Sequence, residues 1–316
     1  MQEITVRIPA STSNLGPGFD CLGVALRIYN DVTVARGASR QHLHPRIVSD
    51  AANRFFKQSR RRAFPFSCSV AENVPWSRGL GSSATIRLGI LLALNRLSGT
   101  PLNRFTIFRL CAELEGHPDN AAPATFGGFT IVQRRATVSV ARDQRDPASP
   151  SGGKRDACPT LQRFAVSPQL NFVLFIPDLE IRTSRARNVL PSNISHIAAV
   201  ENCANACALT AALVSQDYQK LRGTFADHLH QPFRAKLIPF LPCVIAAAEK
   251  AGALGAFLSG SGSTIAAVTL NSSKTIAAAM AHAAKIPGRT IITHADNRGA
   301  EILTNHYSSW AADLNN

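Results

Sequence analysis

The sequence predicts a protein of mixed α and β structure (α+β) that is divided into two domains. Stretches with the alternating apolar pattern of strands are interleaved with stretches whose apolar residues recur every three or four positions, as in helices. The chain has 316 residues, of which 45% are apolar and 17% charged, so it can bury the cores of two ordinary domains. A stretch rich in Pro, Gly and Ser at 141–161 indicates an exposed loop near a domain boundary. We therefore expect one domain at 1–165 and another at 166–316.

The first half is expected to contain four strands and two helices. The alternating pattern predicts strands at 2–9, 28–36, 66–70 and 129–132. Apolar residues at helical spacing predict helices at 82–98 and 103–115. Gly99 and Pro101 are typical signals for the end of the first of these helices.

The second half is expected to contain mainly helices, with two clear strands. The strands are predicted at 170–176 and 265–270, the second of them after a turn at 260–262. Helices are predicted at 195–214, 217–228, 232–249 and 274–285. No internal repeat is visible, so a repeat architecture is not expected.

The net charge of +14 raises nucleic acid as a partner. The stretches 36–62 and 134–163 carry +7 and +4 of that charge, and neither has the interleaved aromatic residues that stack on bases. A solvated basic surface is therefore the favoured interpretation, and nucleic acid is disfavoured as a partner. We expect no membrane-spanning helix, because no run of eighteen apolar residues occurs and no secretion signal is evident.

The seven cysteines are odd in number and form no Cys-x-x-Cys pair, which favours reduced, mostly buried thiols over a disulfide framework. Together with the lack of a secretion signal, this usage predicts a cytoplasmic protein. A metal site at Cys203 and Cys207 would need two further ligands, and the sequence offers none at a suitable spacing.

Residues 75–84 form the loop with the clearest chemical meaning. Gly79 and Gly81 allow the backbone to turn closely, and the predicted helix begins at Ser82. Free N–H groups in the first turn of a helix, together with the helix dipole, form an anion site. The hydroxyls of Ser82 and Ser83 would add ligands for phosphate or Mg²⁺. A glycine turn followed by a serine N-cap, with no ligand, explains the same residues, so the loop alone leaves both interpretations open.

Three loops together resemble the GHMP kinase family. Gly79-Leu-Gly-Ser-Ser-Ala84 is similar to the ATP-binding signature of that family, and the loops at 9–20 and 255–264 agree with it in order and spacing. Within the family, the segments at 115–128, 183–191 and 227–234 resemble the homoserine kinases in particular. The resemblance implies an N-terminal domain like domain 2 of ribosomal protein S5 and a ferredoxin-like C-terminal domain, with ATP and Mg²⁺ as cofactors.

The resemblance also implies roles for individual residues. The ATP phosphates would lie against Pro75, Arg78, Gly79, Leu80, Gly81, Ser82, Ser83, Gly260 and Gly262. Ser83 and Glu115 would hold Mg²⁺, with Glu113 as an alternative ligand. An amino-acid substrate would be bound by Asn14, Asp20, His117, Arg187 and Arg234. Asp20 suits an ammonium group, and the two arginines suit a carboxylate.

The reaction that the resemblance implies is phosphoryl transfer from ATP to the side-chain hydroxyl of L-homoserine, a step of threonine biosynthesis. Asn120 occupies the position where mevalonate-type relatives carry a catalytic aspartate, so catalysis would depend on positioning by Asn120 and Asp20 without a dedicated base. Ser77, Arg78 and Ser263 depart from the family pattern. The resemblance further suggests a homodimer.

Three alternatives remain open at this stage. The chain could be a GHMP kinase for another small alcohol, such as mevalonate or a sugar. It could be a basic nucleic-acid-binding protein with an S5-like domain, whose binding would be sensitive to salt. It could also be a relative that keeps the fold and has lost turnover, although Ser83 and Glu115 argue against that.

Overall fold

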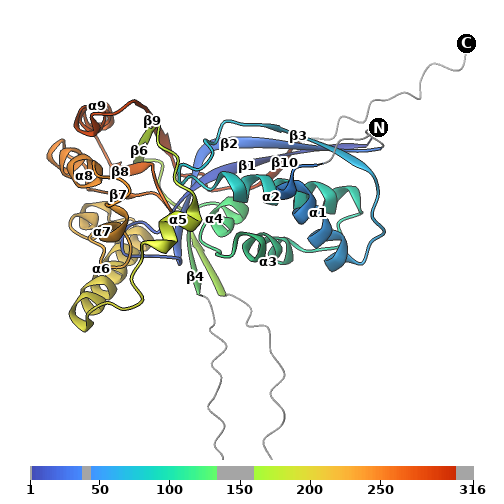
Figure 1. The fold of residues 1–316 in the computed structure, drawn as a ribbon, viewed down its shortest axis with the longest axis horizontal. Coiled ribbons are helices and arrows are strands. Elements are labelled where there is room, and N and C mark those ends of the chain that lie inside the picture. Colours follow the sequence, from blue (N-terminus) through green and yellow to red (C-terminus); the bar gives the residue numbers. More distant parts are fainter. Residues whose placement is uncertain (1, 38–43, 134–159, 304–316) are drawn as a thin grey trace, which may run out of the picture.

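The computed structural model describes residues 2–37, 44–133 and 160–303, which form two antiparallel sheets with helices packed against them (Figure 1). The six-stranded first sheet has the order β10-β1-β2-β4-β5, and β3 pairs with β2 beside that path. The four-stranded second sheet has the order β7-β8-β6-β9. The α+β class expected from the sequence is confirmed.

The first sheet comprises β1 (Glu3–Ser13), β2 (Leu22–Arg36), β3 (Phe66–Ala71), β4 (Phe129–Gln133), β5 (Thr160–Phe164) and β10 (Glu301–Leu303). One face is covered by α1 (Arg46–Ser59), α2 (Ser82–Leu97), α3 (Arg104–Glu115) and α4 (Ala121–Phe126) (Figure 1). Helix α2 packs closely on the sheet at Gly89, where an added Cβ would lie 2.6 Å from the side chain of Val32. This packing fixes the position of the N-terminus of α2.

The second sheet comprises β6 (Asn171–Pro177), β7 (Gly255–Leu258), β8 (Ile265–Thr269) and β9 (Gly288–His294). Helices α8 (Leu241–Lys250) and α9 (Ser273–Ala284) pack against one face of it. The remaining helical elements are α5 (Thr183–Asn188), α6 (His196–Ser215), the 3₁₀ turn η1 (Tyr218–Leu221) and α7 (Gln231–Arg234).

The two sheets share an apolar core. Leu26 and Phe129 of the first sheet and Phe172 and Phe257 of the second belong to one cluster of buried side chains. After β9 the chain returns to the first sheet, where β10 pairs with β1. The expected division between 1–165 and 166–316 stays a prediction, since the last strand crosses back over it.

Most of the expected helices and strands are confirmed within a few residues of their predicted ends. The structure also contains α1, α4, α5, β5, β9 and β10, which the sequence analysis did not predict. Strand β1 extends to Ser13 and β2 begins at Leu22, so the loop between these two strands is shorter than expected. Strand β5 begins at Thr160, inside the expected linker, and 141–159 lie outside the described residues.

Two predicted helices are wrong. The segment 217–228 contains only η1 followed by turns. The predicted helix 232–249 is interrupted between α7 and α8. Pro239 lies in that interruption, and proline lacks the N–H that would continue a helix.

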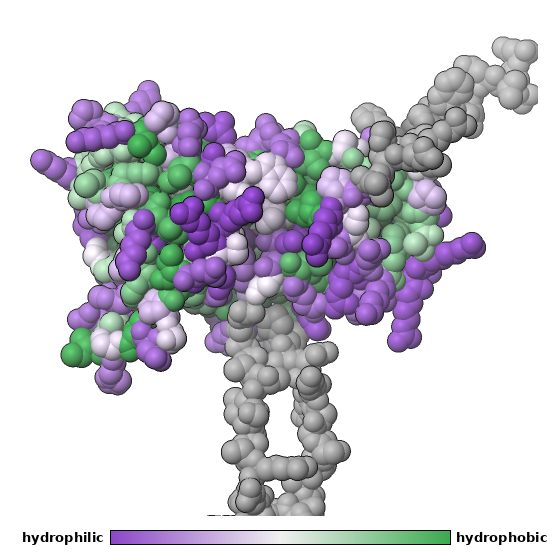
Figure 2. Space-filling view, viewed as in Figure 1, coloured by the Kyte–Doolittle hydropathy of each residue, from purple (hydrophilic) through white to green (hydrophobic). Residues whose placement is uncertain are grey.

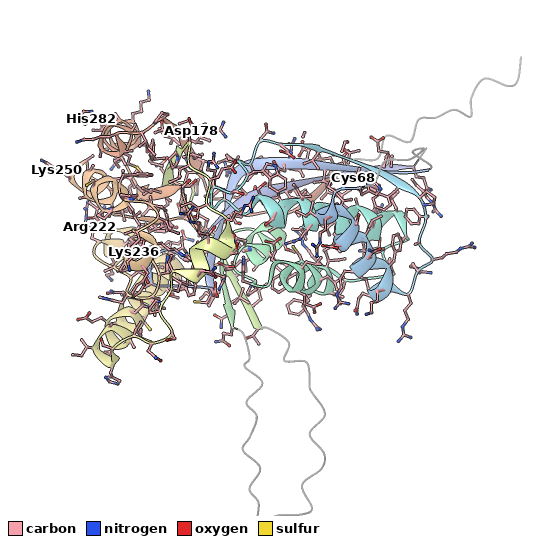
Figure 3. The ribbon with its side chains drawn as sticks, in the orientation of Figure 1. Cys68, Asp178, Arg222, Lys236, Lys250 and His282 are labelled. Carbon is pink, nitrogen blue, oxygen red and sulfur yellow. The ribbon has the colours of Figure 1, made fainter. Side chains whose placement is uncertain are left out.

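Several basic residues of the described chain lie at the outer surface, as the solvated interpretation expects, while 134–159 of the second basic stretch lie outside the described residues. Within the stretch 36–62, α1 buries Val48, Ala51 and Phe55 against the first domain, while the side chain of Arg46 is 95% exposed. Arg222, Lys236 and Lys250 lie at the end of the molecule that holds the second sheet and its helices, and all three residues are exposed (Figure 3).

Helix α6 is partly exposed and largely apolar. It is the one helix in the described part of the chain that has the length and composition to cross a membrane, which the sequence analysis did not expect. Its Asn202 side chain donates to the carbonyl of Pro17 at 2.9 Å, so the helix is anchored to the protein. Its other side presents apolar surface among polar side chains at the lower left of Figure 2. Cys203 and Cys207 lie exposed on this helix, contrary to the expectation that most thiols are buried.

Candidate active site

A cavity of about 270 Å³ lies where the three glycine-containing loops meet. Backbone hydrogen bonds hold the loops together: the N–H of Ser11 donates to Leu80 at 3.1 Å, and that of Gly260 donates to Ser13 at 3.0 Å. A bulge in β2 at Arg27 and Ile28 shifts the register opposite Pro9 and Ala10, and β1 stays paired with β2 as far as Ser13, which brings the next loop to the cavity. Segments that are far apart in the sequence therefore form one site.

Gly79 and Gly81 occupy positions that only glycine can fill without strain. Their φ angles are +75° and +71°, in the left-handed region. A Cβ on Gly79 would lie 2.1 Å from the carbonyl oxygen of Ser259, and one on Gly81 would lie 2.3 Å from the Oγ of Ser11. The close approach of the three loops explains both glycines.

The N-terminus of α2 faces the cavity without a side-chain cap. Its N-cap residue, Gly81, has no side chain, so the first-turn N–H groups receive no capping hydrogen bond from it. The Oγ of Ser82 is buried without a partner, and Ser82 lines the cavity. Unsatisfied donors and the positive end of the helix dipole make this end of the cavity an anion site.

Asp20 and Arg187 form a two-pronged ion pair in the wall of the same cavity. The Nη1 and Nη2 atoms of Arg187 lie 3.1 Å and 2.6 Å from the two carboxylate oxygens of Asp20. The family resemblance assigns both residues to the substrate. In the structure, each side chain neutralises the charge of the other. A zwitterionic ligand would therefore exchange partners with an existing ion pair.

Arg234 is almost entirely buried, with 2% of its surface exposed, yet it lines the cavity. Its Nε donates to the carbonyl of Ala186 at 3.1 Å and its Nη1 donates to that of Gly260 at 2.8 Å. Burial and the nearby charge of Arg187 lower the pKa of Arg234 to about 10. The guanidinium is thus still charged at neutral pH and is held rigidly.

Asn14 is occupied at both ends of its side chain. Its Oδ1 accepts from the backbone N–H of Asp20 at 3.0 Å, and its Nδ2 donates to the carbonyl of Gly260 at 2.9 Å. It is 2% exposed. Asn14 therefore holds Asp20 and Gly260 in place, and it also lines the cavity, so its direct contact with a substrate stays a prediction.

His117 and Asp119 form a buried pair on the cavity wall, joined by a 2.8 Å hydrogen bond between Nδ1 and Oδ1. Burial lowers the pKa of His117, but the hydrogen bond and charge of Asp119 outweigh it, so the net pKa is raised. Burial raises the pKa of Asp119, but the hydrogen bond from His117 reverses this and lowers it. The pair therefore favours its ionised form.

Asn120 is oriented by a hydrogen bond from Ser11, whose Oγ lies 2.9 Å from Asn120 Oδ1. Its amide NH₂ group is the remaining donor, and the residue lines the cavity. This orientation makes Asn120 a donor toward anything bound there.

The expected metal ligands lie in contact with each other. The Oγ of Ser83 donates to Glu115 Oε2 at 2.7 Å, and Arg87 forms an ion pair with Glu115 Oε1. Glu113 is paired with Arg54 and does not line the cavity. No cluster of three or more His, Cys, Asp or Glu suited to a metal occurs among residues 2–37, 44–133 and 160–303.

All the predicted site residues line the cavity except Pro75, Gly262 and the alternative metal ligand Glu113. Gly262 lies behind the wall, where its N–H donates to Ser259. The guanidinium of Arg78 is turned toward the carbonyl of Pro177 and Glu180. Lining residues that the sequence analysis did not single out include Ser13, Phe19, Trp76, Asp119, Arg182 and Thr183.

Comparison with known proteins agrees with the family resemblance found in the sequence. The family model described as the GHMP kinases N terminal domain matches residues 46–128, and that described as GHMP kinases C terminal matches 209–287. A homoserine kinase from Carboxydothermus hydrogenoformans is 34% identical over 96% of this chain and 98% of its own length. One from Nostoc punctiforme is 36% identical over 85% of this chain and 86% of its own.

Solved structures with the same fold include a homoserine kinase from Cytophaga hutchinsonii, with a TM-score of 0.81 and 26% identity, covering 95% of this chain and 97% of that one. A mevalonate kinase matches with a TM-score of 0.66 at 14% identity, which shows the shared fold alone. The two-domain architecture is thus that of GHMP kinases. The chain belongs to the homoserine kinase branch of the GHMP kinase family.

Proposed function

We propose that this protein transfers the γ-phosphoryl group of ATP to the side-chain hydroxyl of L-homoserine, giving ADP and O-phospho-L-homoserine, a step toward threonine. One observation carries the proposal: a single cavity is lined both by an anion site and by separate groups for an ammonium and a carboxylate. The two homoserine kinases named above align with this chain over 98% and 86% of their own length.

The ATP phosphates would lie along Gly79–Ser83 and the first turn of α2. Glycines there leave the backbone N–H groups accessible, and the helix dipole favours negative charge. The engagement of Arg78 with Pro177 and Glu180 argues that the phosphates depend on backbone donors in place of that side chain.

Ser83 and Glu115 suit Mg²⁺, because Mg²⁺ takes hard oxygen ligands and typically uses one or two carboxylates together with substrate phosphates. Their side-chain oxygens lie within 2.7 Å of each other. Bound there, Mg²⁺ would neutralise charge on the transferred phosphoryl group. Arg87 holds the second oxygen of Glu115 and fixes the carboxylate in place.

L-Homoserine would bind by exchange within the Asp20–Arg187 pair. Its ammonium group would take Arg187's place at Asp20, and its carboxylate would be held by Arg187 and Arg234. Each protein charge keeps an opposite charge beside it throughout, so binding avoids leaving an unpaired ion in a partly buried site.

Catalysis would depend on positioning and charge neutralisation. Asn120 is oriented by Ser11 so that its NH₂ group can donate to the γ-phosphoryl group or hold the acceptor hydroxyl in line. The hydroxyl proton would leave with the phosphoryl oxygens or solvent, since an amide cannot accept it.

One assay tests L-homoserine and the alternative acceptors together. ADP release from ATP, with and without Mg²⁺, should be measured against L-homoserine, L-threonine, L-serine, mevalonate and galactose. Selective, Mg²⁺-dependent turnover of L-homoserine supports the proposal. Turnover of mevalonate or galactose instead would overturn the assignment of the acceptor end of the cavity. Salt-sensitive RNA binding without turnover would favour the nucleic-acid alternative.

Three further points belong to this proposal. We propose a cytoplasmic enzyme, in keeping with the free thiols of the described residues. A homodimer is proposed on the resemblance to homoserine kinases. Residues 1–165 and 166–316 are proposed as the two domains, with β10 completing the first sheet.

A further inference from the structure

His230 lies immediately behind the cavity and has no assigned role. It is the N-cap residue of α7, its side chain is fully buried, and it is not one of the residues that line the cavity. It contacts Arg234 on one side and the loop after β1 on the other. A buried imidazole between two parts of a binding site can fix the distance between them.

The partners of the two ring nitrogens determine which one carries the proton. Nε2 lies 2.9 Å from the carbonyl oxygen of Gly16, which can only accept, so Nε2 is the protonated nitrogen. Nδ1 therefore has a free lone pair. It lies 3.2 Å from the Nη1 of Arg234, which can only donate. This tautomer satisfies both neighbours.

The surrounding charges are compatible with a neutral ring. Burial, together with the charge of Arg234, outweighs the carboxylate of Asp227 and lowers the pKa of His230 to about 4. Asp227 lies 3.4 Å from Nε2, but its oxygens already accept backbone N–H groups from Leu229, His230 and Gln231. The ring thus stays neutral at physiological pH and keeps the lone pair that Arg234 needs.

The same ring also supports the loop that carries Asp20. Phe19 stacks on His230 with the ring centroids 5.2 Å apart and the planes at 27°. The guanidinium carbons of Arg187 and Arg234 lie 5.5 Å and 5.3 Å from the Phe19 ring. His230 therefore touches both the arginine expected to bind a carboxylate and the loop expected to bind an ammonium.

We propose that His230 is a positioning residue that sets the separation between Arg234 and the Asp20 loop, and so fits the cavity to an α-amino carboxylate. This inference rests on the proposed function, because it assumes an amino acid as the acceptor. Its Nδ1 lone pair orients Arg234, and its Nε2–H holds the loop through Gly16.

Two conservative variants separate these contacts. His230→Asn keeps an acceptor close to the place of Nδ1, and His230→Gln keeps a donor close to the place of Nε2. His230→Leu keeps neither. His282→Asn, an exposed histidine on α9, serves as the matched control.

We expect His230→Leu to raise the KM for L-homoserine about 10- to 150-fold, the range for one hydrogen bond to a charged group. His230→Gln should show a similar rise, because it loses the acceptor for Arg234. His230→Asn should show only a small one, because it keeps that acceptor and Asn14 still holds Asp20. The KM for ATP should stay unchanged in all three variants. A parallel rise in both KM values, or equal behaviour of the Asn and Gln variants, would overturn the proposal. So would a change in KM that follows the melting temperatures of the variants.

A measurement without substrate keeps this test separate from the test of function. In ¹⁵N-histidine-labelled wild-type protein, His230 should show the Nε2–H tautomer and should not titrate between pH 5 and 8. An Nδ1–H tautomer, or titration near pH 6.5, would overturn the proposal even if L-homoserine is the substrate. Lack of turnover on L-homoserine by the wild type would instead refute the proposed function, and the tautomer measurement would still decide the arrangement.

Discussion

Replacing Asp20 by asparagine removes one charge from the cavity while keeping the local backbone in place. Asp20 has a φ of +59°, and asparagine tolerates this left-handed region as well as aspartate does. The backbone N–H that donates to Asn14 is unaffected by the change. The substitution therefore tests the carboxylate itself.

The expected size of the effect follows from two contacts of Asp20: its ion pair with Arg187 in the free protein and its contact with the substrate ammonium in the complex. In the free protein, the side chains of Asp20 and Arg187 are 20% and 36% exposed, so losing their ion pair should cost at most about 1 kcal/mol of folding stability. In the complex, Asp20 would face the substrate ammonium. Loss of one charge-assisted hydrogen bond there costs about 1.5–3 kcal/mol, or about 10- to 150-fold in KM. We expect the lower end of this range in KM, because in the variant Arg187 has no ion pair with residue 20 to break before the substrate binds.

The assay is steady-state ADP release with L-homoserine varied at saturating ATP, and then with ATP varied. A second substrate, 4-hydroxybutanoate, has the same hydroxyl and carboxylate but lacks the ammonium group. Asp20→Asn should narrow the preference of the enzyme for L-homoserine over this analogue and leave the KM for ATP unchanged. Asp217→Asn, in a surface ion pair with Lys220, is the control. An unchanged KM for L-homoserine, or an unchanged preference, would refute the reasoning.

Three further predictions concern other parts of the cavity. Gly79→Ala should lower the melting temperature and raise the KM for ATP at least about 10-fold, because its Cβ would lie 2.1 Å from Ser259 O and a left-handed alanine itself costs about 1–3 kcal/mol; thermal melts with and without ATP measure both. Asn120→Ala should lower kcat about 100-fold, as loss of one donor to a developing charge does, with no change in the KM for ATP; an unchanged kcat removes Asn120 from the mechanism. Asp119→Asn should destabilise the fold more at pH 5.5 than at pH 9 in urea unfolding. The raised pKa of His117 contributes stability that is complete below the ordinary value near pH 6.5 and is lost as the pH rises through the raised one. The lowered pKa of Asp119 contributes stability that is lost only as the pH falls below about 4. Equal destabilisation at both pH values would contradict this coupling.

The sequence could predict the three loops and most of their residues, because glycines and serines just before a helix indicate a tight turn and an anion site at the helix N-terminus. It did not predict α1, although Val48, Ala51 and Phe55 lie at helical spacing, because polar and charged residues fill most of the positions between them. Short strands such as β10 lack a pattern of their own and form only because β1 offers an open edge.

Roles that depend on tertiary contacts were also beyond the sequence. Asp119 immediately precedes Asn120 in the chain, yet its pairing with His117 is visible only in the folded cavity. The motif predicts a substrate contact for Asn14, and only the folded structure shows that its side chain also bonds to the backbone of two loops. Nothing in the sequence indicates that Asp20, in the loop after β1, and Arg187, on α5, neutralise each other before a ligand binds.

The return of β10 to β1 has a consequence for how the protein is made. Residues 301–303 leave the ribosome almost 300 residues after β1, so at about 5–20 residues per second the outer edge of β1 stays uncovered for roughly 15–60 s. An uncovered strand edge can pair with other chains. Glu3, Thr5 and Arg7 along β1 place polar side chains on alternate positions during that interval. Translation that stops before residue 301 would leave a nascent chain whose first sheet cannot close, and such a fragment should depend on chaperones to remain soluble.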